Sequence, residues 1–154
     1  MTASGSDATI HASAILVGGH AVLIRGPSAS GKSRLAFDLI LAGRAGIIAP
    51  TQLIGDDRVH LSAVDGALVV RPAKSLAGLL EVRGLGLRKM PFVPQGSVNQ
   101  IVDLDAADAT RLPAPAALEA ALNGVKVPRI PVAKGVAALP LVIAALITSP
   151  ATVS

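Results

Sequence analysis

Eight consecutive residues, Gly26 to Ser33, have the types and spacing of a phosphate-binding loop. The segment reads GPSASGKS and matches the pattern G-x-x-x-x-G-K-[ST] at every fixed position. In such loops the backbone N–H groups wrap a polyphosphate, the lysine reaches the β- and γ-phosphates, and the hydroxyl ligates Mg²⁺. Lys32 and Ser33 are therefore candidate phosphate and metal ligands, and the segment predicts nucleotide binding.

Three acidic residues further along the chain could complete such a site. Asp56 and Asp57 follow a short apolar strand. One of them could hold magnesium or its water, and the other could accept the proton of a hydroxyl nucleophile. The structural alternative is an Asp-rich turn that leads into a hairpin. Glu81 is either a further carboxylate near the metal or an exposed strand residue paired with Arg83, and the residues alone leave these roles open.

The loop needs a strand before it and a helix after it, and the sequence predicts both. Residues 10–17 and 21–26 are apolar and joined by Gly-Gly-His, which indicates a β-hairpin. Residues 34–42 are rich in helix formers, and Gly43 is placed to end that helix. Four side chains of this helix are predicted to be buried: Leu35, Phe37, Leu39 and Ile40.

The rest of the chain predicts further strands and helices. A second hairpin is expected around the turn dipeptide Asp65-Gly66. Residues 74–87 suggest a helical start and a tight loop, residues 101–106 a strand, and residues 111–122 a helical turn that begins near Pro115. Together these elements predict an α/β fold in which helices flank a mixed, partly antiparallel sheet with a P-loop.

Composition excludes several classes of protein. The chain has 154 residues, 51% of them hydrophobic and 16% charged, which suits one folded domain. An aromatic fraction of 1% removes the stacking platforms of single-stranded nucleic-acid binders, so no nucleic-acid partner is expected. The absence of cysteine excludes disulfides, thiolate zinc sites and cysteine nucleophiles. A net charge of +4 suits anionic ligands or an acidic partner.

The most apolar segment, residues 136–148, is too short to cross a membrane. A spanning helix needs about 20 residues, and this segment also contains Pro140. We expect it to form a buried terminal helix. The N-terminal residues lack a basic start and a continuous apolar stretch, so no secretory signal is expected. The predicted location is cytoplasmic, with no membrane partner, and residues 1–9 are expected to be disordered ahead of a single domain at residues 10–154.

Several motifs in order resemble the catalytic domain of bacterial HPr kinase/phosphorylase, a P-loop family with a phosphoenolpyruvate carboxykinase-like fold. His11 is similar to the family's histidine ahead of the loop, and GPSASGKS is similar to its phosphate loop, with Ala29 where the family usually has glycine. GDDRVHL resembles its A-D-D-x-V segment. The string LLEVRGLGL resembles its L-E-I-R-G-[LV]-G-I-I signature, which is far more specific than a phosphate loop alone.

The resemblance implies an ATP-dependent serine kinase/phosphorylase that acts on the phosphocarrier protein HPr, with ATP and Mg²⁺ as cofactors. It implies that Ser33 and Glu81 hold Mg²⁺, that the Asp56-Asp57 pair carries the group that accepts and returns the serine proton, and that His11 supports it. The implied catalytic residues are His11, Lys32, Asp56, Asp57 and Arg111. The implied nucleotide-binding residues are Gly26, Pro27, Ser28, Ala29, Ser30, Gly31, Lys32 and Ser33.

The similarity is closest over residues 10–87. Arg111 is matched to a family active-site arginine that lies in an R-L-G context. In the family's P-V-x-x-G-R-N segment, Val136 and Ala137 replace arginine and asparagine, and Lys134 could compensate for the lost charge. The chain is identified as a short form without the N-terminal domain, and the resemblance implies a homo-oligomer, a hexamer.

Two other functions fit the same residues. One is a small-molecule kinase on the same scaffold, and the other is a nucleotide sensor without catalytic activity, which the change at Val136 and Ala137 would favour.

Overall fold

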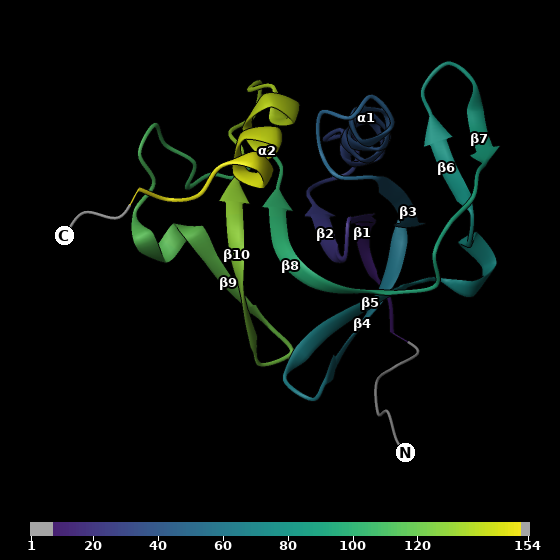
Figure 1. The fold of residues 1–154 in the computed structure, drawn as a ribbon, viewed down its shortest axis with the longest axis horizontal. Coiled ribbons are helices and arrows are strands. Elements are labelled where there is room, and N and C mark those ends of the chain that lie inside the picture. Colours follow the sequence, from purple (N-terminus) through teal and green to yellow (C-terminus); the bar gives the residue numbers. More distant parts are fainter. Residues whose placement is uncertain (1–7, 152–154) are drawn as a thin grey trace.

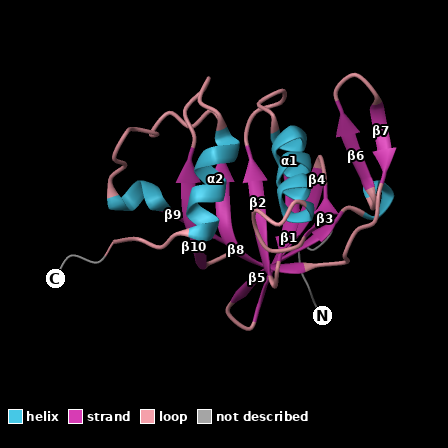
Figure 2. Ribbon diagram, turned by 45° about the horizontal axis from the view of Figure 1, so that its top comes forward, coloured by secondary structure: helices cyan, strands magenta, loops and turns pink. Residues whose placement is uncertain are grey.

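A computed structural model of the chain describes residues 8–151 and contains one mixed sheet, a separate hairpin and two α-helices (Figures 1 and 2). The strands are β1 (Ile10–Val17), β2 (His20–Arg25), β3 (Thr51–Gly55), β4 (Arg58–Val64), β5 (Ala67–Pro72), β6 (Leu79–Val82), β7 (Gly86–Lys89), β8 (Gly96–Asp103), β9 (Glu119–Leu122) and β10 (Val125–Pro131). The helices are α1 (Lys32–Arg44) and α2 (Ala138–Ile147), and short 3-10 helices span Lys74–Leu76 and Pro115–Leu118. The predicted α/β class with a mixed sheet is confirmed. Residues 1–7, expected to be disordered, lie outside the described part.

The main sheet combines antiparallel and parallel pairing. Strand β1 pairs with β2 along one edge, and with β3 and then β4 along the other, all antiparallel. Strand β8 pairs in parallel with both β2 and β10, while its first residues pair antiparallel with β5. The carboxyl ends of β2, β8 and β10 therefore lie at one edge of the sheet, where the phosphate loop leaves β2.

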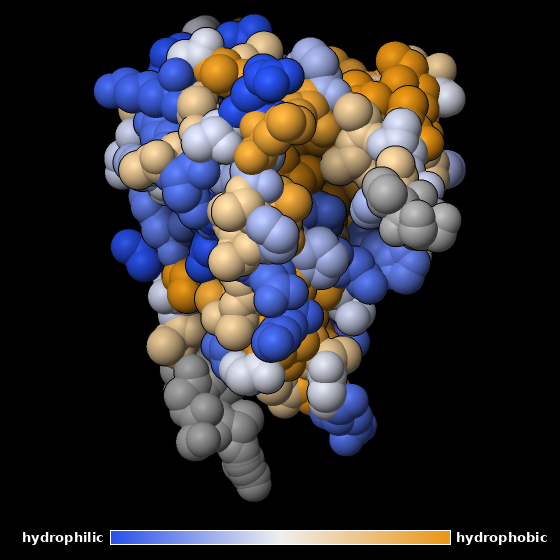
Figure 3. Space-filling model, turned by 90° about the vertical axis from the view of Figure 1, so that its left-hand side faces the viewer, coloured by the Kyte–Doolittle hydropathy of each residue, from blue (hydrophilic) through white to orange (hydrophobic). Residues whose placement is uncertain are grey.

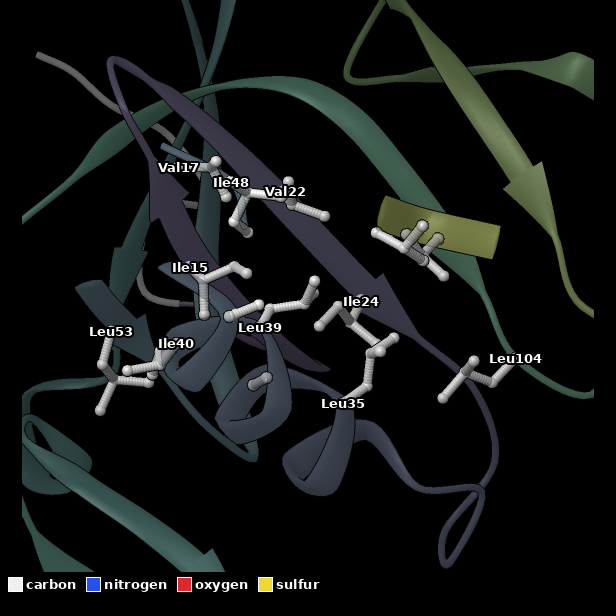
Figure 4. Close-up of a cluster of buried hydrophobic side chains, with 14 of the residues drawn as sticks. Ile15, Val17, Val22, Ile24, Leu35, Leu39, Ile40, Ile48, Leu53 and Leu104 are labelled. Carbon is white, nitrogen blue, oxygen red and sulfur yellow. The ribbon is translucent and has the colours of Figure 1, made fainter. Parts of the chain in front are cut away.

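Side chains alternate along the central strands and build one hydrophobic cluster on each face. On one face, Ile15 of β1 and Ile24 of β2 pack against Leu35, Leu39 and Ile40 of α1 (Figure 4). Residues of the opposite phase, among them buried alanines of β1 and β2, form a second cluster with β4, β5 and β8. Strands with a period of two are thereby buried on both faces, which fixes their register.

Helix α1 runs further than its sequence predicts. Gly43 lies inside the helix, which ends at Arg44 with Ala45 as its C-cap. A Cβ atom at Gly43 would come within 2.6–2.8 Å of Thr51 atoms at the start of β3. Gly43 therefore allows the close approach of α1 to β3, and the prediction that it ends the helix is wrong. Of the four side chains predicted to be buried, Leu35, Leu39 and Ile40 are buried and Phe37 is half-buried.

Both predicted hairpins are confirmed, and two further hairpins appear. The Asp65-Gly66 turn between β4 and β5 has positive φ angles of 51° and 81°. Residues 74–87 form only one short 3-10 helix before the β6–β7 hairpin, and the segment from Pro115 is helical only to Leu118 before it becomes β9. The β9–β10 hairpin turns at Asn123-Gly124, whose φ angles are 51° and 79°. Asn-Gly is a strong hairpin signal, so the longer helical interpretation missed a turn that the sequence contains.

The terminal helix forms as predicted, but it is not buried. In α2 only Val142 is fully buried, while Leu141 and Ile147 are 42% and 60% exposed. Figure 3 views the molecule from the side of β9, and hydrophobic residues gather at the top right of this face. Among the described residues, no helix has both the length and the apolar character needed to span a membrane.

Candidate active site

The phosphate motif forms the connection between β2 and α1. Strand β2 ends at Arg25, and Gly31 is the N-cap of α1 with a φ of 101°, a left-handed conformation that glycine adopts without strain. Ala29 adopts a similar conformation, with a φ of 63°, although its Cβ disfavours it. The first N–H groups of α1 have no partners within the helix, so they are available to an anion.

Lys32 is buried at the start of α1, with 7% of its surface exposed. Its ammonium donates hydrogen bonds to the carbonyl oxygens of Gly26 at 2.8 Å and Pro27 at 3.0 Å. An ammonium has three protons, so one remains for a phosphate oxygen. The lysine thus holds the loop in its folded shape and keeps its positive charge beside it.

The acidic pair, Asp56 and Asp57, connects β3 to β4. Both strands pair with β1, β3 through residues 14–17 and β4 through Ile10 and His11, so the two aspartates occupy the break between them. Asp57 has a φ of 70°, a left-handed conformation that aspartate tolerates better than most residues. The break directs the two neighbouring carboxylates into different surroundings: Asp56 is 3% exposed, and the side chain of Asp57 is 60% exposed.

Asp56 is held by three neutral donors. Its Oδ1 accepts a hydrogen bond from the Ser13 hydroxyl at 2.5 Å, and its Oδ2 accepts one from the Glu81 backbone N–H at 3.1 Å. The hydroxyl of Ser33 lies 2.9 Å from Oδ1 and 2.8 Å from Oδ2. Within residues 8–151, no arginine, lysine or histidine forms an ion pair with this carboxylate.

Asp57 forms a pair with His11. The Nε2 atom of His11 lies 2.8 Å from Oδ1 of Asp57, and the His11 side chain is 41% exposed. The second oxygen, Oδ2, has no hydrogen-bond partner among the side chains that the structure describes. A carboxylate oriented on one side and open on the other is suited to accept a proton from a bound hydroxyl.

A pocket of about 940 Å³ brings most of the predicted residues together. Its lining includes His11, Asp57, residues 28–34 of the loop and the start of α1, Phe37, and residues 81–84 of the β6–β7 hairpin. The exposed side chain of Glu81 therefore faces the same space as Ser33. The described residues contain no group of three or more His, Cys, Asp or Glu side chains close enough to hold a metal by themselves.

Several predicted residues are not among those that line this pocket. Gly26, Pro27 and Asp56 are absent from the lining, although Asp56 binds Ser33, which belongs to it. Arg111 lies in an exposed loop after β8, and neither it nor Lys134 is among the pocket's lining residues. The segment with Val136 and Ala137 is also outside the lining. The catalytic role of Arg111 stays a prediction.

The sequence reasoning missed a charged cluster at the carboxyl ends of β2, β8 and β10. Arg25 donates two hydrogen bonds of 2.7 Å to the two oxygens of Asp103, and Arg129 donates one of 2.6 Å to Oδ2. Arg129 also binds Asp108 at 2.8 and 3.0 Å and the carbonyl of Ala117 at 2.9 Å. The cluster ties the loop after β8 to the sheet edge.

The arginines set the ionisation of the cluster. Burial acts to raise the pKa of Asp103, but hydrogen bonds and charges from Arg25 and Arg129 outweigh it and hold that pKa below its usual range. The hydrogen bond from Arg129 likewise lowers the pKa of Asp108, and the same contact raises the pKa of Arg129. These acids therefore stay charged in the folded protein.

A mixed sheet with helices packed on it, in which the segment between β2 and α1 lines the same pocket as an acid and a histidine, defines a protein of the α/β class. Within that class, a family model described as HPr Serine kinase C-terminal domain matches residues 3–149, so the chain belongs to this family.

Individual relatives agree with this membership. The chain is 38% identical over 81 residues to the HPr kinase/phosphorylase of Clostridium beijerinckii, and 39% identical over 80 residues to that of Streptococcus thermophilus. These segments cover 53% and 51% of this chain, and the chain spans 24% of each relative's length. A solved structure of the Hpr(Ser) kinase/phosphatase from Coxiella burnetii superposes with a TM-score of 0.71 at 26% identity, covering 91% of this chain and 93% of that one.

Proposed function

We propose that this chain is the catalytic domain of an ATP-dependent serine kinase/phosphorylase that transfers phosphate to and from the phosphocarrier protein HPr. The observation that carries the proposal is the accessible Asp57–His11 pair, which lines the same pocket as the complete phosphate motif. Membership of the HPr Serine kinase C-terminal domain family supports the choice of substrate.

The phosphate loop binds and orients the nucleotide. Backbone N–H groups at the start of α1 and the ammonium of Lys32 provide positive charge around the phosphates. Because Lys32 is anchored to two loop carbonyls, its position is fixed before any phosphate binds. Positive groups that need no rearrangement stabilise a transferring phosphoryl group most effectively.

The residues around Asp56 fit a divalent cation. The buried carboxylate of Asp56 is held only by neutral donors, and buried carboxylates are normally paired with a positive charge or coordinate metals. The donors that face the pocket here are oxygens, the type of ligand that Mg²⁺ prefers. Ser33 and Glu81 would hold the ion, with Asp56 orienting the Ser33 hydroxyl. Bound Mg²⁺ would offset negative charge on the phosphates.

Asp57 moves the proton. In the kinase direction its free oxygen accepts the proton of the substrate serine, whose oxygen forms a bond to the γ-phosphorus while the bond to the bridging oxygen breaks. In the phosphorylase direction, the same acid returns a proton to the serine oxygen as its bond to phosphorus breaks. His11 orients Asp57 through the contact at Oδ1. The two aspartates thus have different roles: Asp56 orients a metal ligand, and Asp57 transfers the proton.

The test is incubation of the purified chain with labelled ATP, Mg²⁺ and HPr, followed by measurement of label on HPr. Wild-type protein should transfer label to one serine, and Lys32→Ala should abolish transfer. Because its ammonium binds only carbonyls of the loop, any structural change should be confined to the loop and leave the sheet and helices folded. Equal transfer by wild type and Lys32→Ala would remove the loop from the mechanism.

The same assay separates the other functions. ATP turnover stimulated by free metabolites but not by HPr would indicate a small-molecule kinase. ATP binding without transfer to any acceptor would indicate a nucleotide sensor. The hexameric assembly and the cytoplasmic location expected from the sequence stay predictions, and a mass measurement in solution tests the first.

A further inference from the structure

Ser13 is a fully buried hydroxyl in a strand that is otherwise apolar at this point. It lies on β1 between Ala12 and Ala14, and all three residues are 0% exposed. A hydroxyl removed from water at such a position is unfavourable unless it is hydrogen-bonded, and alanine would fit the neighbouring pattern better. The single side-chain partner that the structure gives Ser13 is Oδ1 of Asp56, at 2.5 Å.

The contact fixes the orientation of a carboxylate that has a second task. Ser13 binds one oxygen of Asp56 and the Glu81 N–H binds the other, so the two donors hold the carboxylate from opposite sides. The Ser33 hydroxyl lies between the two oxygens, at 2.9 and 2.8 Å. Ser33 has one proton, and with that proton directed at Asp56 its lone pairs face the pocket.

We infer that Ser13 is a positioning residue for the cation site, acting through Asp56 on Ser33. Without the Ser13 hydroxyl, one oxygen of Asp56 loses its separate donor, the carboxylate is free to turn, and the direction of the Ser33 lone pairs is no longer fixed. Groups that orient metal ligands in this way typically change metal affinity by about 10–100-fold. The inference rests on the proposed function, because it takes the pocket to bind a nucleotide with Mg²⁺.

The test measures binding rather than turnover. Nucleotide affinity is determined by calorimetry for wild type, Ser13→Ala and Ser13→Thr, once in EDTA and then over a series of Mg²⁺ concentrations. Ser13→Ala should leave the affinity in EDTA unchanged and raise the Mg²⁺ concentration needed for tight binding by about tenfold or more. Ser13→Thr keeps the hydroxyl and should restore the wild-type requirement.

A matched control separates positioning from packing. Thr51 is also buried, on the neighbouring strand β3, and its hydroxyl donates to the carbonyl of Ala49 at 2.9 Å, away from the pocket. Thr51→Val and Ser13→Ala should both lower the melting temperature by about 2–4 °C, the shift expected for one lost hydrogen bond in a domain of this size. Only Ser13→Ala should change the Mg²⁺ requirement. If Ser13→Ala does not fold, Ser13→Cys keeps the volume with a weaker donor and should show a smaller shift in the same direction.

Two outcomes would overturn the inference in distinguishable ways. A Ser13 variant with a lower melting temperature and a wild-type Mg²⁺ requirement would limit Ser13 to packing and leave the proposed function intact. Wild-type protein that binds no nucleotide at any Mg²⁺ concentration would overturn the proposed function and this inference with it.

Discussion

Asp56 directly follows strand β3 and Asp103 ends strand β8 of the same sheet, and their carboxylates are held by different kinds of donor. Asp56 receives hydrogen bonds from two serine hydroxyls and one backbone N–H, all of them neutral. Asp103 receives its hydrogen bonds from the guanidinium groups of Arg25 and Arg129. Both carboxylates therefore have hydrogen-bond donors at both oxygens, but only Asp103 has cationic partners.

The difference separates a structural acid from one available for function. Around Asp103, the charges of two arginines and two aspartates cancel. Their ion pairs connect β2, β8 and β10 to the loop after β8. No cationic side chain of residues 8–151 pairs with the Asp56 carboxylate, which binds Ser33 of the pocket lining, so the surroundings of Asp56 favour a cation in the pocket. Four predictions, in order of decreasing expected effect, test this contrast and the pocket beside it.

Asp57→Asn should lower turnover by about 10²–10⁴-fold, the usual contribution of a general base. Asparagine tolerates the left-handed backbone of residue 57, so the fold should persist. Rates with HPr and with phosphoserine-HPr measure the effect, and microscopic reversibility requires a loss in both directions. Asp65→Asn, at another left-handed aspartate in the β4–β5 turn, is the matched control and should change neither rate. A variant impaired only in the forward direction would contradict the shared role.

Asp103→Asn should lower the free energy of unfolding by about 3 kcal/mol, because it leaves two partly buried arginines without a full counter-charge. Nucleotide affinity should not change, since Asp103 binds Arg25 and Arg129, neither of which lines the pocket, whereas Asp56 binds Ser33, which does. Asp56→Asn, in contrast, should weaken Mg²⁺-dependent nucleotide binding. Urea denaturation and calorimetry on both variants test the contrast, and a loss of nucleotide affinity in Asp103→Asn would show that the two acids are not separate in function.

The Asp103 cluster should also make stability depend on pH in the acid range. Because the folded pKa of Asp103 is lowered, its contribution is present above the unfolded pKa of about 3.9 and is lost as pH falls through the folded value. Arg25→Gln should therefore be less stable than wild type by about 1–2 kcal/mol at pH 6, with the difference shrinking below pH 4. Urea midpoints from pH 2 to 6 measure this. Arg34→Gln, in the exposed pair with Asp38, should give curves that follow wild type, and parallel curves for Arg25→Gln would be inconsistent with the lowered pKa.

Ala29→Gly should have the smallest effect. The left-handed φ of 63° costs alanine about 1–2 kcal/mol, and glycine removes this strain but adds about 0.5–1 kcal/mol of chain entropy. The variant should be more stable than wild type by less than about 1 kcal/mol, measured as a rise in the urea midpoint. A clear loss of stability would show that residue 29 is not strained.

The features that sequence predicted correctly are encoded locally. The phosphate motif, the Asp65-Gly66 turn and the helix after Lys32 each depend on residues within about one turn of one another. The Asn123-Gly124 turn was equally local and could have been found, but the alanine-rich segment before it favours a helix, and pairing with β10 overrides that preference.

The division of the acidic pair could not be predicted from local pattern. Asp56 and Asp57 are adjacent and identical in type, and their roles differ because β1 supplies Ser13 to one and His11 to the other. The arginine cluster is equally hidden, since Arg25 and Asp103 meet only when β2 pairs with β8. Burial of α2 was overestimated because hydropathy does not show how much of a helix the sheet can cover.

The parallel pairing of β2 with β8 has a consequence for how the chain folds during synthesis. The β1–β2 hairpin is local and can form within about 1–10 μs, but the other edge of β2 is completed by Val98 to Asp103. At about 5–20 residues per second, the ribosome needs roughly 4–16 s to reach that strand after β2 is made. During this interval the backbone N–H and C=O groups on that edge of β2, from Ala21 to Arg25, lack the strand that pairs with them in the folded protein and are open to pairing with other chains.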